Sequence, residues 1–152
     1  IHGIASALGG MFEAPHGALC AALLPAAIDV NITKILKLPA EHKTEMKNFL
    51  NRFAAVGEVL DTAMENRDSV LRGNGYYGVL PEQRCVRLPE QSHAILRERV
   101  MELCRRMKIP PLNRWGITEE DVPLIAKSSE CKNNPVKLEQ DEIERIISSS
   151  LY

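Results

Sequence analysis

The sequence lacks an excess of charge of either sign, and this absence excludes the simplest mode of nucleic-acid binding. Its 152 residues include 19 basic and 20 acidic side chains, which give a formal net charge of −1. A protein that binds nucleic acid through the phosphate backbone needs a basic patch that outweighs its acidic groups. We therefore expect no nucleic-acid partner.

Long uninterrupted apolar runs are missing as well. The longest run, from Ala18 to Val30, is interrupted by Pro25 and is shorter than the roughly 20 residues that a membrane-spanning helix needs. The N-terminus has no basic stretch ahead of an apolar segment, as a secretory signal peptide would have. We therefore expect no membrane partner.

Paired cysteines of the CxxC type are also absent. The four cysteines are Cys20, Cys85, Cys104 and Cys131, and none has the spacing to a histidine that a zinc finger shows. Cys20 and Cys104 fall in apolar, helix-like patterns, in which a free thiol behaves as a small hydrophobic side chain. We predict reduced thiols and a cytoplasmic location.

Two common catalytic motifs do not occur either. The stretch Gly73-Asn74-Gly75 is not followed by the helix start and the lysine that a phosphate-binding P-loop needs. Ser6 has no adjacent acid–base partner and lies in no nucleophile elbow. The acidic residues 119–121 are better explained as the start of a helix, because Thr118 and Asp121 have capping-box spacing.

What the sequence does contain is a series of helical patterns and no convincing strand. Apolar residues recur at steps of three and four residues in most of the chain. The expected helices cover 1–9, 15–30, 41–63, 92–108, a short stretch after 118, and 139–150, with Gly9-Gly10 ending the first. Residues 66–90 lack such a period and are predicted to form an irregular insertion. A chain of this length suits one domain, so we predict a single all-α domain over residues 1–152.

The four histidines differ in their surroundings. His42 and His93 lie beside charged residues near expected helix starts and are predicted to be exposed. His2 and His16 have small, apolar neighbours, and a turn between their helices would aim both imidazoles at one point. Imidazole is a common ligand of zinc and iron. The spacing alone nevertheless favours two separate structural histidines, because a catalytic metal usually has three protein ligands.

The N-terminal stretch resembles the signature of the iron-containing alcohol dehydrogenase family. That signature has a histidine, a small-residue helix, a Leu-Gly turn, and a Pro-His-Gly motif whose histidine follows the first by fourteen residues. Here it would comprise His2, the turn Leu8-Gly9 and Pro15-His16-Gly17. Weaker matches follow in the family's order at residues 53–57, 108–110, 115–118 and 133–135. Residues 66–90 have no counterpart.

The resemblance implies a helical bundle like the C-terminal domain of the dehydroquinate synthase-like and iron-dependent alcohol dehydrogenase fold. It implies that His2 and His16 are two of four ligands of a divalent metal, Fe(II) or Zn(II). The other two ligands, and the binding site for NAD or NADP, would belong to a Rossmann-like N-terminal domain that precedes Ile1. We therefore expect part of a longer enzyme, which by itself binds metal weakly, binds no nicotinamide cofactor and is inactive. Its oligomeric state stays open, a homo-oligomer included.

The resemblance also implies a reaction and a departure from the family pattern. In the family the metal acts as a Lewis acid on the alcohol oxygen while hydride passes to the nicotinamide, so the implied substrate is a small alcohol or aldehyde. Many members have a further histidine near the nicotinamide, four residues after the first, where this chain has Ser6. A hydroxyl can pass a proton along a water chain, but it does not titrate near neutral pH as histidine does.

Two alternatives stand beside this interpretation. The first is a maleylacetate reductase or another oxidoreductase of the same superfamily, although Leu8-Gly9 and Pro15-His16-Gly17 favour the alcohol dehydrogenases. The second is a metal-free helical interaction module, which predicts that His2 and His16 lie far apart or face solvent. Imidazole nitrogens more than about 6 Å apart, with no rotamer able to converge, would exclude a shared metal, because metal–nitrogen bonds are near 2 Å.

Overall fold

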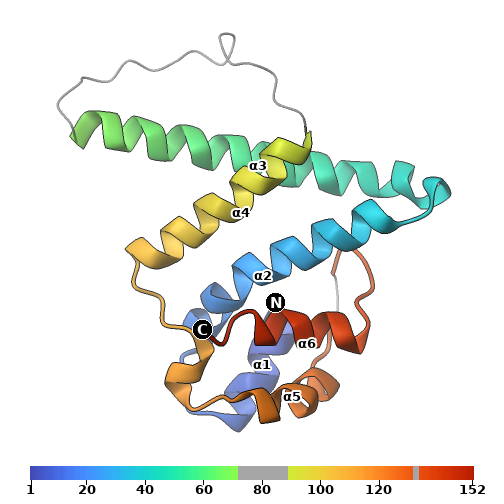
Figure 1. The fold of residues 1–152 in the computed structure, drawn as a ribbon, viewed down its shortest axis with the longest axis vertical. Coiled ribbons are helices and arrows are strands. Elements are labelled where there is room, and N and C mark those ends of the chain that lie inside the picture. The colour runs from blue at the N-terminus through green and yellow to red at the C-terminus, as the bar shows by residue number, and fades with distance from the viewer. Residues whose placement is uncertain (72–88, 132–133) are drawn as a thin grey trace.

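The computed structural model describes the backbone of residues 1–71, 89–131 and 134–152, and the side chains of 1–39, 41–42, 46–65, 93–131 and 134–152 (Figure 1). The elements are α1 (His2–Met11), α2 (His16–Lys37), α3 (Ala40–Leu71), α4 (Pro89–Arg106), the 3₁₀ turns η2 (Leu112–Trp115) and η3 (Glu119–Asp121), α5 (Val122–Ser128) and α6 (Gln140–Ser148). No strand occurs among the described residues, and the predicted all-α fold is confirmed.

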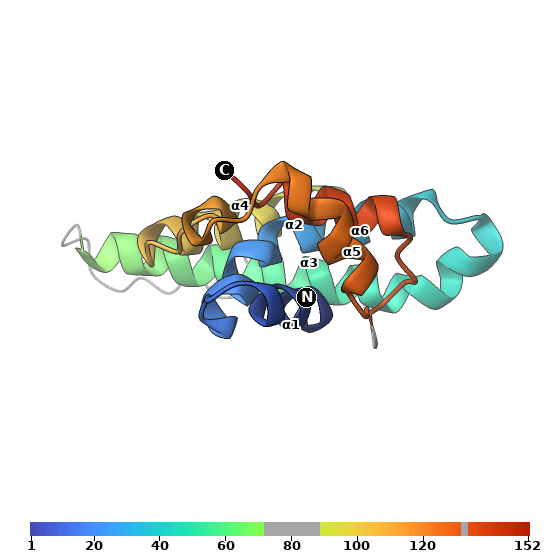
Figure 2. The ribbon, with the colours of Figure 1, turned by 90° about the horizontal axis from the view of Figure 1, so that it is seen from below.

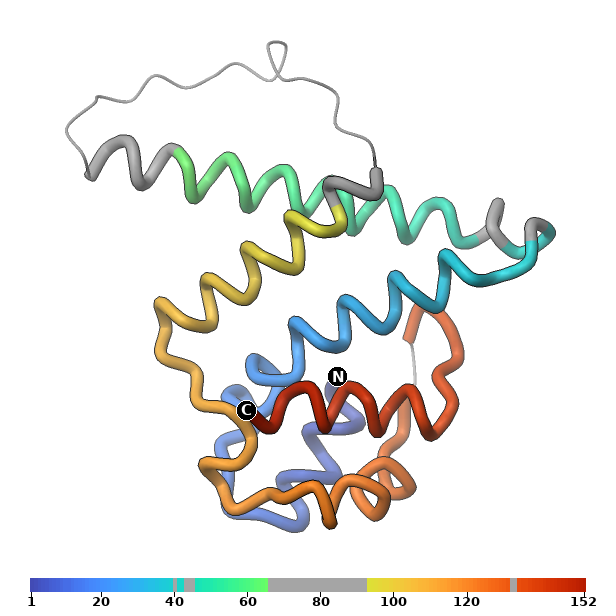
Figure 3. The backbone as a smooth tube through the Cα atoms, in the orientation of Figure 1, coloured from blue at the N-terminus to red at the C-terminus, as the bar shows by residue number. Residues whose placement is uncertain are grey.

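Helix α2 is the centre of the arrangement. It contacts α1 and α6 on one side and α3 and α4 on the other. Figure 1 shows α3 and α4 crossing at one end of the molecule, with α1 and α5 at the opposite end. Figure 2 gives the same arrangement from below. In Figure 3 the chain can be followed from α4 down to α5, so the C-terminal elements return to the end where α1 lies.

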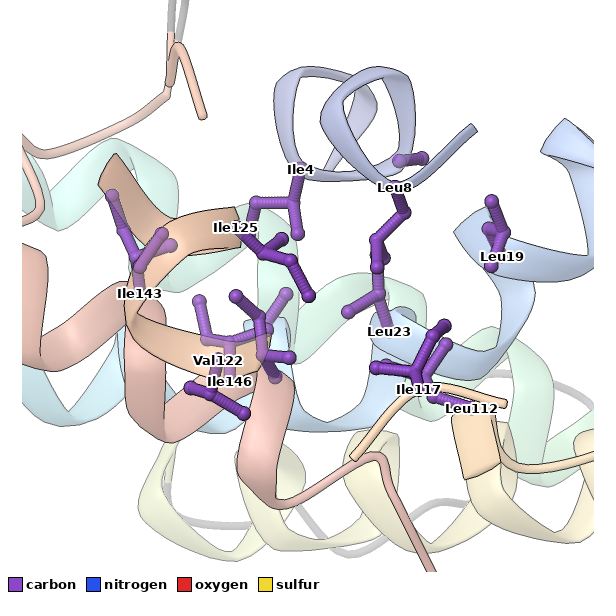
Figure 4. Close-up of a cluster of buried hydrophobic side chains, with 14 of the residues drawn as sticks. Ile4, Leu8, Leu19, Leu23, Leu112, Ile117, Val122, Ile125, Ile143 and Ile146 are labelled. Carbon is purple, nitrogen blue, oxygen red and sulfur yellow. The ribbon is translucent and has the colours of Figure 1, made fainter. Parts of the chain in front are cut away.

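The larger hydrophobic core lies at the α1 end (Figure 4). Its fully buried members come from α1, α2, η2, α5, α6 and the segments that follow η2 and α6. They include Ile4, Leu8, Leu19, Leu23, Leu112, Ile117, Ile125, Ile146, Ile147 and Leu151. The predicted inward face of the last helix, Ile143, Ile146 and Ile147, is confirmed. The C-terminus is held against η2, because the Leu112 N–H donates to the Ser150 carbonyl at 2.9 Å.

A smaller cluster joins α2 to α3 and α4. Its buried members are Ile28, Ile32, Leu96 and Val100, and apolar residues of α3 such as Leu50, Phe53 and Leu60 pack against them. The two outer helices are also linked by charge. Arg99 donates to the buried Asp61 carboxylate from Nε at 2.7 Å and from Nη2 at 2.6 Å. Both N–H groups bind the same carboxylate oxygen, Oδ1, so α4 is held to α3 at one point.

Several helix ends differ from the prediction. Helix α1 runs through Gly9 and Gly10 to Met11, so the predicted stop at these glycines is wrong. A glycine inside a helix costs only about 0.5–1 kcal/mol relative to alanine, which the buried face of α1 outweighs. Helix α2 extends past Val30 to Lys37. The predicted irregular segment 66–90 is helical at both ends, and its remainder, 72–88, lies outside the described residues.

By length and composition, α2 is the one described helix that could cross a membrane. It has 22 residues and is longer than the apolar run from Ala18 to Val30 that was identified in the sequence. However, 44% of its most apolar window is buried within the structure, and core helices of soluble proteins pass the same test. This is weak evidence for a membrane segment.

The structure also tests the predictions for His42, His93 and the Thr118 cap. His42 is exposed as predicted, with 59% of its side chain accessible. His93 is 6% exposed, so the prediction of a surface position is wrong. Its Nε2 lies 2.9 Å from the Leu50 carbonyl, which can only accept, so Nε2 carries the proton. The Thr118–Asp121 capping box is confirmed, with the Thr118 N–H donating to Asp121 at 2.9 Å.

Candidate metal centre

His2 and His16 each lie at the beginning of a helix. His2 is the first residue of α1, and His16 is the first residue of α2 after the N-cap Pro15. Proline suits the start of a helix because its φ is already near −65°, and Pro15 has φ −63°. The packing of α1 on α2 through Leu8 and Leu23 then places the two N-terminal turns side by side.

The structure brings the two predicted ligand atoms together. Nδ1 of His2 lies 3.2 Å from Nε2 of His16. The rings are nearly parallel, with centroids 5.5 Å apart and planes inclined by 12°. The metal-free alternative predicted imidazoles that lie far apart or face solvent. The imidazole nitrogens lie close together, well within the separation of about 6 Å beyond which a shared metal would be excluded. Both side chains are exposed.

A third potential ligand, Cys20, was missed by the sequence interpretation, which treated it as a small hydrophobic residue. Its Sγ lies 3.5 Å from Nε2 of His16 and 3.6 Å from Nδ1 of His2. The three ligand atoms form the one group of three or more such side chains, among the described residues, that could hold a metal ion. The signal was present in the sequence, because residues four apart share a face of a helix and Cys20 follows His16 by four. Burial raises the pKa of the Cys20 thiol.

A cavity of about 840 Å³ opens beside His2. Ser6, the position that the family resemblance places near the nicotinamide, also lines it. Its lining is mixed, with Ile1, Ala7, Leu24, Ala27, Ile28, Phe53 and Pro135 as apolar members and Asn31, Ser128, Glu130 and Asn134 among the polar ones. The volume is within the roughly 300–1,000 Å³ typical of small-molecule sites.

One wall of this cavity is fixed by an amide pair. Asn31 of α2 is 6% exposed and donates to the Ala27 carbonyl at 2.8 Å. Its Oδ1 accepts a hydrogen bond from Asn134 at 2.6 Å, and Asn134 also donates to the Val136 carbonyl at 2.7 Å. The segment before α6 is thereby attached to α2 at the edge of the cavity.

The opposite wall is fixed by a close approach of two backbones. A Cβ atom built on Gly3 would lie 1.6 Å from the Glu130 carbonyl oxygen, which is far inside contact distance. Only glycine therefore fits in the first turn of α1 at this point. The contact places His2 and the segment after α5 on the same cavity.

The other described cysteines have different surroundings from Cys20. All three described cysteines are free thiols. Cys104 of α4 donates to the Ala21 carbonyl at 3.5 Å and packs against the smaller cluster. Cys131 lines the cavity. Burial raises the pKa of both thiols.

Comparison with known proteins identifies the family. The profile of the "Fe-containing alcohol dehydrogenase family, C-terminal" matches residues 1–151. The chain therefore belongs to the iron-containing alcohol dehydrogenase family and corresponds to its C-terminal domain. A search of curated protein sequences finds no match.

A solved structure supports the fold. A chain described as "1,3-propanediol oxidoreductase" superposes with a TM-score of 0.65 at 22% sequence identity. The match covers 98% of this chain but only 31% of that one. The chain therefore spans about a third of the length of this structural relative. At this identity the likeness shows the fold alone, a helical C-terminal domain.

Proposed function

We propose that the chain is the metal-holding part of an oxidoreductase that transfers hydride between a small alcohol and NAD or NADP. The observation that carries the proposal is the convergence of His2 Nδ1 and His16 Nε2 to 3.2 Å. Family membership over residues 1–151 supports it. Neutral imidazoles are donors that suit both candidate metals, Fe(II) and Zn(II), so the residues present fit the implied ion.

The chain's own residues have distinct parts in this proposal. His2 and His16 hold the metal at the two helix starts, and the adjacent cavity takes the substrate. A divalent metal bound there would act as a Lewis acid toward the alcohol oxygen and lower its pKa. Apolar cavity residues such as Leu24 and Phe53 exclude water from the substrate chain. Ser6 is exposed to the same cavity and passes the alcohol proton toward solvent.

The proposal requires a second domain. Two imidazoles leave coordination positions that other groups must fill, and no part of the described chain offers a dinucleotide-binding loop. We place the remaining family ligands and the nicotinamide site in a Rossmann-like domain that closes over the exposed His2 and His16. Exposure of both imidazoles is consistent with a centre that is completed at a domain boundary.

Replacing His16 by alanine is expected to remove the metal. In the longer polypeptide that joins this chain to its cofactor-binding domain, the variant should lose alcohol-dependent reduction of NAD or NADP. Its metal content, measured by atomic emission after dialysis, should fall below about a tenth of one equivalent, because loss even of partners outside the ligand shell typically weakens metal binding 10–100-fold. His42→Ala is the matched control, since His42 is exposed on α3 far along the chain from the centre.

Retention of one metal equivalent by His16→Ala would refute the ligand assignment. Full metal content without oxidation of any of a panel of primary alcohols and diols, with either nicotinamide cofactor, would refute the reaction. Reduction of maleylacetate in place of alcohol oxidation would select the other oxidoreductase of the superfamily.

A further inference from the structure

Cys20 has surroundings that a core cysteine would not need. It lies one turn after His16 on α2, and one side of it packs against the larger hydrophobic core. Its sulfur faces both imidazoles, with the three ligand atoms all within 4.8 Å of one another. Cys104, in contrast, belongs to no such group among the described residues and directs its thiol to the Ala21 carbonyl.

The distances among the three atoms match those of a tetrahedral metal site. With metal–nitrogen bonds of about 2.05 Å and a metal–sulfur bond of about 2.3 Å, tetrahedral angles put two nitrogens about 3.4 Å apart and each nitrogen about 3.6 Å from sulfur. The observed separations are 3.2 Å between the nitrogens and 3.5 and 3.6 Å from the nitrogens to Sγ. The three atoms are therefore spaced as the ligands of a single ion would be.

We propose that Cys20 is a third metal ligand supplied by this chain, so that His2, His16 and Cys20 together hold a zinc-class ion. The inference deepens the proposed function and rests on its two histidine ligands. Three protein ligands are the usual number in a catalytic zinc site, so this chain alone could hold the ion before the second domain adds its groups.

The thiolate changes which metal the centre prefers. Sulfur is a softer ligand than nitrogen or carboxylate oxygen, and it suits Zn(II) much better than Mg(II). Zn(II) and Co(II) also bind more tightly than Fe(II) to a given set of such ligands. The site should therefore bind zinc without the second domain, because its three ligand atoms already lie close enough together to bind one ion.

Cobalt titration tests the inference directly. Co(II) added to the reduced 152-residue chain should produce a sulfur-to-cobalt charge-transfer band in the near ultraviolet, with the intense visible bands of a tetrahedral ion. Zn(II) should displace it and Mg(II) should not. Cys20→Ser should abolish the charge-transfer band and weaken Co(II) binding at least roughly tenfold. Cys104→Ser, which changes a half-buried thiol of α4, should alter neither.

The outcomes separate this inference from the proposed function. A charge-transfer band that persists in Cys20→Ser, or wild-type Co(II) binding without such a band, overturns Cys20 as a ligand. Absence of any Co(II) binding by the folded wild-type chain overturns the three-ligand site. Either result leaves the two-histidine assignment standing if the longer polypeptide loses its metal in His16→Ala. Cys20→Ala and the far-ultraviolet circular dichroism of each variant distinguish a lost ligand from a lost fold.

Discussion

Replacing Gly3 by alanine is expected to lower the free energy of unfolding by about 3 kcal/mol or more, at or above the upper end of typical overpacking costs. The added methyl would lie 1.6 Å from the Glu130 carbonyl oxygen and 2.5 Å from its carbonyl carbon. These are backbone atoms, so no side-chain rotation can relieve the overlap. The first turn of α1 must move away from the segment after α5, and His2 must move with it. Urea unfolding followed by circular dichroism measures the loss.

Gly9→Ala is the matched control in the same helix. Nothing lies within 4 Å of a Cβ built on Gly9, and its φ is not in the left-handed region. Alanine there should stabilise α1 by about 0.5–1 kcal/mol, because glycine is the weaker helix former. Equal stabilities of the two variants would show that α1 does not approach Glu130 as described.

Ile125→Ala should destabilise the domain by about 2–5 kcal/mol, the range for large-to-small changes in a packed core. Ile125 is fully buried in the larger core, where α5 meets α1 and α6 (Figure 4). The truncation removes apolar contacts and leaves a cavity that the helices close only in part. The change in urea midpoint, at constant denaturant dependence, gives the loss.

The neighbouring Leu124 provides the comparison. It belongs to the same helix, but 59% of its surface is accessible. Leu124→Ala should change stability by no more than about 0.5 kcal/mol. A similar loss in both variants would mean that α5 does not bury the face that contains Ile125.

The helices of this fold could be predicted because their apolar residues recur at helical intervals. The face of α6 with Ile143, Ile146 and Ile147 is the clearest case. Helix ends were less predictable, since they depend on packing. Gly9 and Gly10 have the local character of a stop, yet α1 continues past them to Met11, and the Phe12 N–H still donates to the Leu8 carbonyl.

The candidate site also has residues that could be predicted from the sequence and residues that could not. His2 and His16 were predicted as a ligand pair from the family resemblance, because the motif is compact, whereas their spacing alone favoured two separate histidines. The four-residue spacing from His16 was a partial signal for Cys20, but its second histidine neighbour lies on the other helix and depends on how α1 packs against α2. His93 was predicted to be exposed, but its ring faces the Leu50 carbonyl of α3. The surroundings of Cys20 and His93 depend on contacts between segments that are distant in sequence.

Helix α2 carries His16 and Cys20 at its beginning and Ile28 and Ile32 of the smaller cluster farther along. An α-helix turns by about 100° per residue, so these two groups have a fixed rotational phase. Inserting or deleting one residue between them would turn the ligand pair away from His2 or turn the apolar stripe away from α4. Substitutions in this stretch leave that phase intact, whereas changes in its length alter it. The number of residues between Cys20 and Ile28 is therefore more constrained than their identity.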